Sequence, residues 1–386
     1  MKESLLLPKV QKFISENLDV QLPDLLFKKP IFEEVSNQDL AIQIQGRKTA
    51  QKKFPAFNQE YILFPPKLNL EQTSSQATAE YKSQGLSGRA FLDLTCGFGI
   101  DAFFLSQHFE TVTLVEQNRQ LLDLVAHNWQ QLGRKANFID QDLMQFLNDA
   151  PQHFDLIYLD PARRDAHKKK VFLLEDLSPN VLEIQEKLLE KSPKVLMKLS
   201  PLIDLKYLCT VLKNIARIDI IAVKNEVKEI VVLQNLETSK PNIEGRCVNL
   251  ETSEPVFHFT INDEPSGAIN YAAPRRYLYI PNNAILKSGA YAKLAAQYQL
   301  EKLHPNTHFF TSEVLIDHFP GRILEVKILE AKQIKKKSTY NIISKNHPLS
   351  PAEIKKKYQL KDGGDRYLIF TQTLNGKIIL EGIQKK

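Results

Sequence analysis

Two glycines and two aspartates lie close together in the segment Asp93-Leu94-Thr95-Cys96-Gly97-Phe98-Gly99-Ile100-Asp101. The segment follows an apolar run that predicts a strand, and it opens a predicted helix. Glycines at such a turn let the backbone approach a ligand closely, and the first N–H groups of the helix are free to bind it. We therefore expect a ligand-binding turn. A plain tight turn and the loose G-x-G-x-x-A pattern of dinucleotide-binding folds, which residues 97–102 also fit, are the alternatives.

Acidic residues follow the predicted strands one after another. Asp93 ends the first, Glu116 the second and Asp160 the fourth, and Asp142 lies just past the third. Because ligands bind outside the carboxyl ends of parallel strands, we expect these side chains to share one crevice. Glu116 suits ribose hydroxyls, and Asp142 suits an adenine amino group. Asp93 or Asp101 suits a ligand ammonium, so the set matches a ligand with adenosine at one end and a charged amino acid at the other.

Short apolar runs that alternate with helical patterns must position these residues. The runs are residues 90–94, 111–116, 137–139, 155–160, 194–199, 218–223 and 229–234. Helical patterns such as 117–132 and 179–191 separate most of them, which predicts an α/β fold around a mostly parallel sheet. Only residues 224–228 separate the last two runs. A parallel crossover needs about a dozen residues, so this pair should be an antiparallel hairpin.

The regions on either side of this sheet are predicted in less detail. Before it, Ser36 and Asp39 have the spacing of a helix start. After it, residues 246–251 and 256–261 predict a hairpin, and residues 277–281, 284–300 and 308–312 predict a strand, a helix and a strand. Residues 322–329 predict a strand. Ser350 then starts a helix that Gly363-Gly364 should end, before a strand at 365–373.

The formal net charge of +6 is unevenly distributed along the chain. Residues 322–386 hold 15 Lys and Arg against 6 Asp and Glu, a net of +9, whereas residues 1–321 hold 36 against 39, a net of −3. A basic segment on a slightly acidic body is typical of polyanion-binding proteins. The lysine runs 335–337 and 355–357 could be a solvated face, but the interleaved Tyr340, Tyr358 and Tyr367 favour RNA.

Residues 71 to 235 resemble the class I S-adenosylmethionine-dependent methyltransferases. The likeness is carried by the glycine turn, the acid after the second strand, the segment Phe138-Ile139-Asp140-Gln141-Asp142 and the segment that ends in Asp160-Pro161-Ala162-Arg163-Arg164-Asp165. It implies a Rossmann-like sheet with a terminal antiparallel hairpin, and S-adenosylmethionine as cofactor. The cofactor-binding residues that it implies are Gln72, Asp93, Gly97, Phe98, Gly99, Asp101, Glu116, Asp142, Asp160 and Pro161. Among them, Gln72 would lie on a helix over the cofactor.

The whole chain resembles a bacterial group of methyltransferases with small domains after the catalytic one. The resemblance implies an N-terminal mainly helical region at 1–70, a methyltransferase domain at 71–240, a ferredoxin-like α+β segment at 241–320 and a THUMP-like basic domain at 321–386. The stretch 350–371 carries the THUMP-like part. Because true THUMP domains accompany tRNA-modifying enzymes, the resemblance implies an RNA substrate, with tRNA favoured over rRNA.

The segment Asp160-Pro161-Ala162-Arg163 bears on the reaction. Related amino-methylating enzymes have an aromatic residue that stacks the flipped base where this chain has Arg163, so methylation of a base amine is in doubt. RNA 5-methyluridine enzymes need a cysteine just after the fifth strand, where this chain has Ser200. We expect Asp160 to orient the methyl acceptor and Arg163 to bind a phosphate or stack on a base. A strand terminator and a solvated arginine are the alternatives.

Two further functions stay open: a catalytically idle RNA-binding protein that keeps this fold, and a methyltransferase for a protein or small molecule. Cys96, Cys209 and Cys247 are too far apart for a disulfide framework, and we expect them to be buried. The spacing of His304 and His308 does not predict a metal site. No uncharged apolar run approaches the ~18 residues of a membrane span, so we expect a soluble, cytoplasmic protein.

Overall fold

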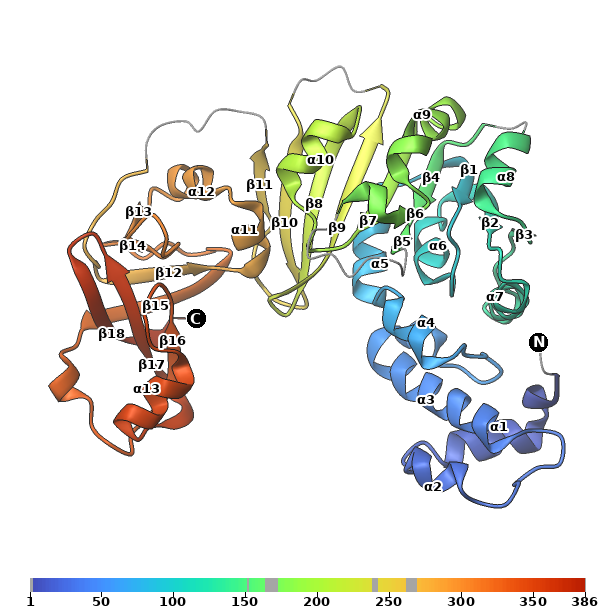
Figure 1. Cartoon of the computed structure of the whole chain (residues 1–386), viewed down its shortest axis with the longest axis horizontal. Helices are drawn as coiled ribbons and strands as arrows, with labels where there is room; N and C mark the ends of the chain where they lie inside the picture. The colour runs from blue at the N-terminus through green and yellow to red at the C-terminus, as the bar shows by residue number, and fades with distance from the viewer. Residues whose placement is uncertain (1–2, 151–152, 164–172, 238–241, 262–268, 386) are drawn as a thin grey trace. The chain divides into compact units, whose positions relative to one another are not determined.

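The computed structural model describes residues 3–150, 153–163, 173–237, 242–261 and 269–385, and the Arg163 side chain is outside this description. The chain divides into two compact units. The first comprises Met1–Ile215 and Val231–Ser239, and the second comprises Ala216–Ile230 and Lys240–Lys386. Figure 1 shows the elements of both.

The first unit begins with a helical region that has its own apolar core. Its main helices are α1 (Pro8–Glu16), α2 (Leu22–Leu26), α3 (Asn37–Lys53), α4 (Lys67–Gln72) and α5 (Gln76–Ser83). The Ser36 hydroxyl accepts a hydrogen bond from the Asp39 N–H at 3.1 Å, so the predicted start of α3 is confirmed. Val10, Ile14 and Ile44 are almost fully buried in the core of this region.

A parallel sheet follows, with its strands in the order β7-β4-β1-β2-β3. These strands are β1 (Gly88–Asp93), β2 (Phe109–Val115), β3 (Asn137–Ile139), β4 (Leu156–Leu159) and β7 (Lys194–Leu199). The helices between and after them are α6 (Ile100–Leu105), α7 (Arg119–Gln131), α8 (Leu143–Asp149), α9 (Val181–Lys191) and α10 (Leu205–Val211). Every residue of β4 is buried, as expected of a strand covered on both faces. The predicted α/β fold with a mostly parallel sheet is confirmed.

The predicted terminal hairpin is formed by β8 (Ile215–Val223) and β9 (Glu226–Asn235), which are neighbours in the sheet. Its turn is tighter than the five residues expected, because only Lys224 and Asn225 connect the two strands. Both have positive φ, 47° and 66°, as in the type I′ turn that matches the twist of antiparallel strands. The chain passes from the second unit to the first within β9.

The second unit continues with β10 (Glu244–Leu250) and β11 (Phe257–Thr260), which form the predicted antiparallel pair. A seven-stranded sheet follows, in the order β13-β14-β12-β15-β18-β17-β16. Its strands are β12 (Tyr277–Pro281), β13 (Glu301–Lys302), β14 (Phe310–Ser312), β15 (Gly321–Ile328), β16 (Thr339–Ser344), β17 (Lys361–Thr373) and β18 (Gly376–Gln384). The helices of this part are α11 (Asn283–Ser288), α12 (Tyr291–Gln297) and α13 (Pro351–Tyr358).

Two predicted elements of this unit are corrected by the structure. The single helix expected over 284–300 is two helices, because Gly289 adopts a φ of 68° and ends α11. The helix that starts at Ser350, as predicted, ends at Tyr358 with Gln359 in the left-handed conformation, not at the two glycines. Gly363 and Gly364 instead lie inside β17, where its pairing with β16 is irregular.

Strand β17 buries side chains on both of its faces. Leu368 and Phe370 belong to the core that includes Ile354 of α13, whereas Ile369 lies in the core formed with Leu324 and other strand residues. The basic C-terminal segment is therefore part of the core of the second unit. Among the helices that the structure describes, none has the length and apolar character to cross a membrane.

Candidate functional site

The glycine turn between β1 and α6 needs its two glycines for different reasons. Gly97 and Gly99 both have left-handed backbone conformations, with φ of 54° and 76°. A Cβ atom on Gly99 would lie 2.8 Å from Val125 Cγ1, so Gly99 also allows close packing against α7. A Cβ on Gly97 would meet only the Thr95 carbonyl oxygen, at 3.8 Å. Gly97 therefore borders open space, where a ligand can approach the backbone.

Asp93 ends β1 and is almost completely buried, at 1% exposure. Its Oδ1 accepts a hydrogen bond from the Thr95 N–H at 2.8 Å. Burial raises the pKa of Asp93 to about 8 despite that bond, and the carboxylates of Asp101, Asp160 and Glu116 add to the rise. Within the described part of the chain, no lysine or arginine pairs with Asp93. This carboxylate would gain stability from a cation supplied by a ligand.

Glu116 directly follows β2 and ties the glycine turn to the start of α7. Its Oε2 accepts from the Gly97 N–H at 3.0 Å, and its Oε1 accepts from the Asn118 N–H at 2.8 Å. Each oxygen of a carboxylate can accept more than one hydrogen bond. Glu116 is therefore oriented by the protein and can still accept bonds from the hydroxyls of a ligand.

Asp101 is held by cations of the protein itself. Lys82 Nζ lies 2.8 Å from its Oδ1, and the Ser74 and Tyr158 hydroxyls each donate to its Oδ2 at 2.7 Å. Burial acts to raise the pKa of Asp101, but the ammonium groups of Lys82 and Lys198 hold it well below its usual range. The predicted contact of Asp101 with a ligand ammonium is therefore not supported by the geometry, because its carboxylate is already paired.

Asp160 follows β4 and is partly accessible, with 34% of its side chain exposed. Its backbone N–H donates to the Thr95 hydroxyl at 2.7 Å, and its Oδ2 pairs with Lys198 at the end of β7. Burial raises the pKa of Asp160, and the neighbouring Lys198 opposes that rise. The side chain is thus held on one side and open on the other.

The charges of this cluster of acids and lysines, which we call the crevice, do not cancel among the described residues. Four carboxylates belong to Asp93, Asp101, Glu116 and Asp160, and two ammonium groups belong to Lys82 and Lys198. The lysines pair directly with Asp101 and Asp160, and no described lysine or arginine pairs with Asp93 or Glu116. Because burial raises the pKa of Asp93 to about 8, this carboxyl is mostly protonated near pH 7 in the absence of a ligand, and a cationic ligand would favour its ionised form. Glu116 adds negative charge, so the site favours a cationic ligand.

Three other predicted residues lie around the crevice in different settings. Asp142 is exposed and caps α8, where its Oδ1 accepts from the Met144 and Gln145 N–H groups. Its second oxygen can still accept from a ligand. Pro161 is buried beside Asp160. Gln72 is the exposed last residue of α4, and the residue that reaches the crevice is Ser74, two positions later.

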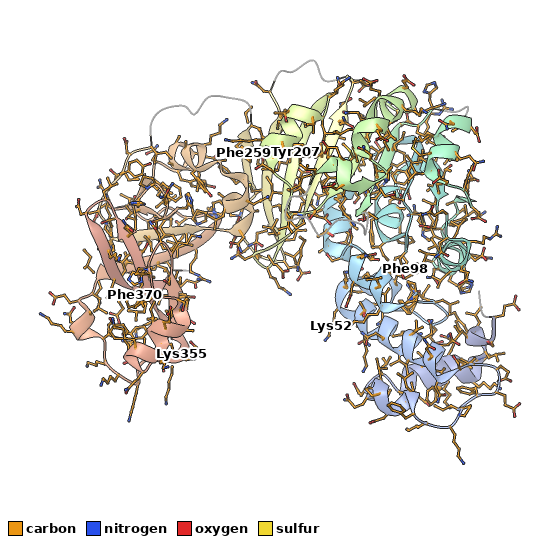
Figure 2. All side chains as sticks on the ribbon, viewed as in Figure 1. Lys52, Phe98, Tyr207, Phe259, Lys355 and Phe370 are labelled. Carbon is orange, nitrogen blue, oxygen red and sulfur yellow. The ribbon has the colours of Figure 1, made fainter. Side chains whose placement is uncertain are left out.

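The ring of Phe98 points away from a ligand position. It is 3% exposed and packs against Phe54, Phe57 and Phe64, with centroid distances of 5.8, 5.8 and 6.1 Å. Figure 2 labels Phe98 next to the N-terminal helices. Only the backbone of Phe98 can contribute to the predicted ligand contact, because the ring belongs to the core that joins these helices to the turn.

The backbone of Arg163 lies in the short strand β5 (Ala162–Arg163), which pairs with β6 (Leu177–Ser178). Its predicted contact with a phosphate or a base falls outside the described residues, which do not include the Arg163 side chain. Cys96 is buried as predicted, and burial raises the pKa of its thiol well above the usual range.

The structure adds five residues that sequence reasoning missed: Ser74, Lys82, Thr95, Tyr158 and Lys198. One signal was available, because Lys198 interrupts the apolar residues of β7 near its carboxyl end, where the acids converge. Lys82 offered no such signal, since a lysine in the last turn of a short helix is ordinary. Its burial becomes visible only when α5 packs beside Asp101.

In the basic segment of the second unit, the lysines and the interleaved tyrosines differ in exposure. Lysines 335–337 are exposed, as a polyanion-binding face requires. The tyrosines are not: Tyr340 is 4% exposed and donates its hydroxyl to Glu381 at 2.8 Å. Tyr358 packs on Phe370 at a centroid distance of 5.8 Å. Tyr340 therefore does not support the expectation that the interleaved tyrosines favour RNA, because its ring belongs to the core.

Comparisons with known proteins agree with this architecture. Residues 75–200 match the family described as Conserved hypothetical protein 95. Residues 277–320 match a ferredoxin-like domain, and residues 322–381 match a THUMP domain-like family. All the crevice residues described above except Gln72 and Ser74 lie within the first of these matches.

One solved structure resembles the whole chain. It is the crystal structure of a "putative methyltransferase" from Porphyromonas gingivalis W83, with a TM-score of 0.86, 29% identity, and coverage of 100% of this chain and 98% of that one. The resemblance expected from the motifs is confirmed. The likeness extends beyond the α/β domain to the ferredoxin-like and THUMP-like parts.

Two other relatives match only part of the chain. An uncharacterized RNA methyltransferase of Mycoplasma mobile is 30% identical over 89 residues, which are 23% of this chain and 24% of that protein. The chain thus spans about a quarter of the length of this curated relative. A "putative methyltransferase" from Streptococcus mutans, solved in complex with SAH, matches 41% of this chain and 96% of its own, with 15% identity and a TM-score of 0.31.

Proposed function

We propose that this protein is an S-adenosylmethionine-dependent methyltransferase that acts on RNA, with tRNA favoured over rRNA. The observation that carries the proposal is the pair of uncompensated carboxylates, Asp93 and Glu116, on either side of the turn at Gly97. The cofactor fits this arrangement because it brings an ammonium, a positive sulfonium and ribose hydroxyls. A dinucleotide brings phosphates instead, and the surplus negative charge of the crevice disfavours them.

Each part of the cofactor has a candidate partner. Asp93 would pair with its ammonium, and the backbone of residues 97–99 would lie along its methionine end, next to the open space beside Gly97. Glu116 would accept from the ribose hydroxyls, and Asp142 would accept from the adenine amino group through its free oxygen. When bound, S-adenosylmethionine supplies an electrophilic methyl group.

Asp160 would orient the methyl acceptor. Its carboxylate is partly exposed and held by Lys198, so it can accept a hydrogen bond from an N–H or O–H group of the substrate. Orientation of the acceptor can supply much of the acceleration of such a displacement. Ser200 after β7 offers no thiol, which disfavours the chemistry of the RNA 5-methyluridine enzymes.

RNA is proposed as the substrate from three independent supports. The last 65 residues carry a net charge of +9. Residues 322–381 match a THUMP domain-like family, and the curated relative of the chain is named as an RNA methyltransferase. Exposed lysines bind the phosphate backbone of RNA without reading its sequence.

A second candidate function is RNA binding without catalysis. The segment Asp160-Pro161-Ala162-Arg163 favours it, because it lacks the aromatic residue that stacks a flipped base in related amino-methylating enzymes. This candidate predicts salt-dependent binding of tRNA but no methyl transfer.

The test is transfer of tritium from methyl-labelled S-adenosylmethionine. The acceptors are total RNA from cells that lack the gene, total RNA from normal cells, and total protein. We expect label in the RNA from the deletion strain and little in the other two, and mass spectrometry of nucleosides would name the missing methylnucleoside. Binding of tRNA without label would support the idle protein, and label in protein would overturn the RNA assignment.

A further inference from the structure

Four charged side chains form a chain of alternating sign beneath the crevice. Lys82 pairs with Asp101, Lys198 Nζ lies 3.5 Å from the other oxygen of Asp101, and Lys198 also pairs with Asp160. Lys198 Nζ is in addition 3.3 Å from the Ser74 hydroxyl oxygen. The network therefore connects α5, α6, β7 and the residue that follows β4.

Accessibility changes along this chain of charges. The side chains of Lys82 and Asp101 are 0% and 9% exposed, Lys198 is 11% exposed, and Asp160 is 34% exposed. The deep end is closed and the Asp160 end is open. Only Asp160 among the four can contact a large substrate without a rearrangement of the core.

The ammonium group of Lys198 is held in one position by its neighbours. A lysine on a surface samples many rotamers, whereas this ammonium has two carboxylates and a hydroxyl around it. Its pairing with Asp160 uses Oδ2. The bond fixes the rotation of the Asp160 carboxylate and leaves Oδ1 as the oxygen that can face a substrate.

We propose that Lys198 is a positioning residue that acts through Asp160: it is anchored by Asp101 and sets the direction in which Asp160 meets the N–H or O–H of the methyl acceptor. This inference rests on the proposed methyltransferase function. The role assigned to Lys198 differs from that of Asp93 and Glu116, because it concerns the methyl acceptor and not the cofactor. Removal of Lys198 should slow turnover and leave cofactor binding intact.

The experiment compares the full-length wild type with Lys198→Met, Lys198→Gln, Lys198→Arg, Asp160→Asn and the double variant K198M/D160N. The matched control is Lys194→Met, at the opposite end of the same strand. Turnover is measured as tritium transfer to RNA from the deletion strain, and cofactor affinity by calorimetric titration with S-adenosylmethionine. Circular dichroism shows whether each variant folds. If Lys198→Met does not fold, Lys198→Gln takes its place, both alone and combined with Asp160→Asn.

We expect Lys198→Met to lower kcat about 100-fold, the scale of a misplaced catalytic group, with cofactor affinity changed less than about twofold. Lys198→Arg should recover part of the loss, and Lys194→Met should match wild type. Because Lys198 acts through Asp160, adding K198M to D160N should change kcat little. An equal loss of kcat when K198M is added to wild type and to D160N would overturn the role of Lys198, and so would wild-type turnover by Lys198→Met. Either result would leave the proposed methyltransferase function standing. An inactive wild type would overturn the proposed function instead.

Discussion

The crevice of the first unit and the basic segment of the second carry opposite charges and organise them in opposite ways. In the crevice, Asp93 and Asp101 are at least nine-tenths buried, and backbone or side-chain groups orient each carboxylate. In the basic segment, lysines 335–337 are exposed. Buried, oriented charges can distinguish one small ligand from another, whereas exposed lysines contribute attraction that salt screens. We therefore propose that the crevice recognises a cofactor and that the basic segment attracts a polyanion.

The largest contrast concerns ion pairs. Asp101→Ala leaves Lys82 buried without its main partner, and loss of one member of a buried pair typically costs about 3–5 kcal/mol. Asp362→Ala breaks the exposed pair with Lys355, seen on α13 in Figure 2, and should cost at most about 0.5 kcal/mol. Calorimetric unfolding of both variants measures the difference. Similar losses in the two would contradict the contrast.

The second prediction uses the pKa of Asp93, which burial raises to about 8. A carboxyl with a raised native pKa binds more protons when folded than when unfolded between about pH 4 and pH 8, so stability should fall as the pH rises through this window. Asp93→Asn lacks this titration and should melt roughly 5 °C above wild type at pH 8, equivalent to about 2 kcal/mol. Melting curves from pH 5 to 9 check this, and parallel curves would refute it.

The third prediction tests the basic segment by substituting its lysines, since deletion of the segment would disturb the fold. Removing residues 322–386 would take away β15 to β18 and expose Leu278 and Phe309 of the core, so loss of binding would be ambiguous. Glutamine at 335–337 and 355–357 removes six charges and keeps the strands. We expect tRNA affinity to fall about 10- to 100-fold at low salt, with a shallower salt dependence. Cofactor affinity should not change. Unaltered tRNA binding would place the RNA surface elsewhere.

The smallest effect is expected at Tyr340. Because its ring is buried and its hydroxyl bonds Glu381, Tyr340→Phe should cost about 1 kcal/mol of stability and leave tRNA affinity within about twofold. Filter binding together with thermal melting separates the two readouts. A large loss of tRNA affinity at unchanged stability would contradict this prediction and indicate that Tyr340 contributes to RNA binding.

Features were predictable from the sequence when neighbouring residues in the chain determine them. The strand that ends at Asp93, the strand that Glu116 follows and the turn at Gly97 were predictable, because apolar runs and glycines indicate the local structure of their own neighbourhood. The hairpin was predictable from its short connection. Its two-residue turn was not, because Lys224 and Asn225 are not the usual glycine-containing pair.

The ion network could not be predicted, because its members are far apart in the chain. Lys82 and Lys198 meet at Asp101 only once α5 and β7 are placed around α6. For the same reason Asp101 is one of two candidates that the sequence offers for a ligand ammonium, whereas in the structure Lys82 and Lys198 pair with it. Phe98 shows the converse: its place within the motif suggested a ligand contact, but packing against the N-terminal phenylalanines determines where its ring points.

The central claim is that uncompensated acids in the crevice hold a cationic, adenosine-bearing cofactor. Calorimetric titration of S-adenosylmethionine into wild type and Asp93→Asn tests it most directly, with Asp123→Asn on the exposed face of α7 as the control. We predict one molecule bound per chain, binding about 100-fold weaker in Asp93→Asn, and no change in the control. Equal affinity of wild type and Asp93→Asn, or no binding by the wild type, would contradict the account.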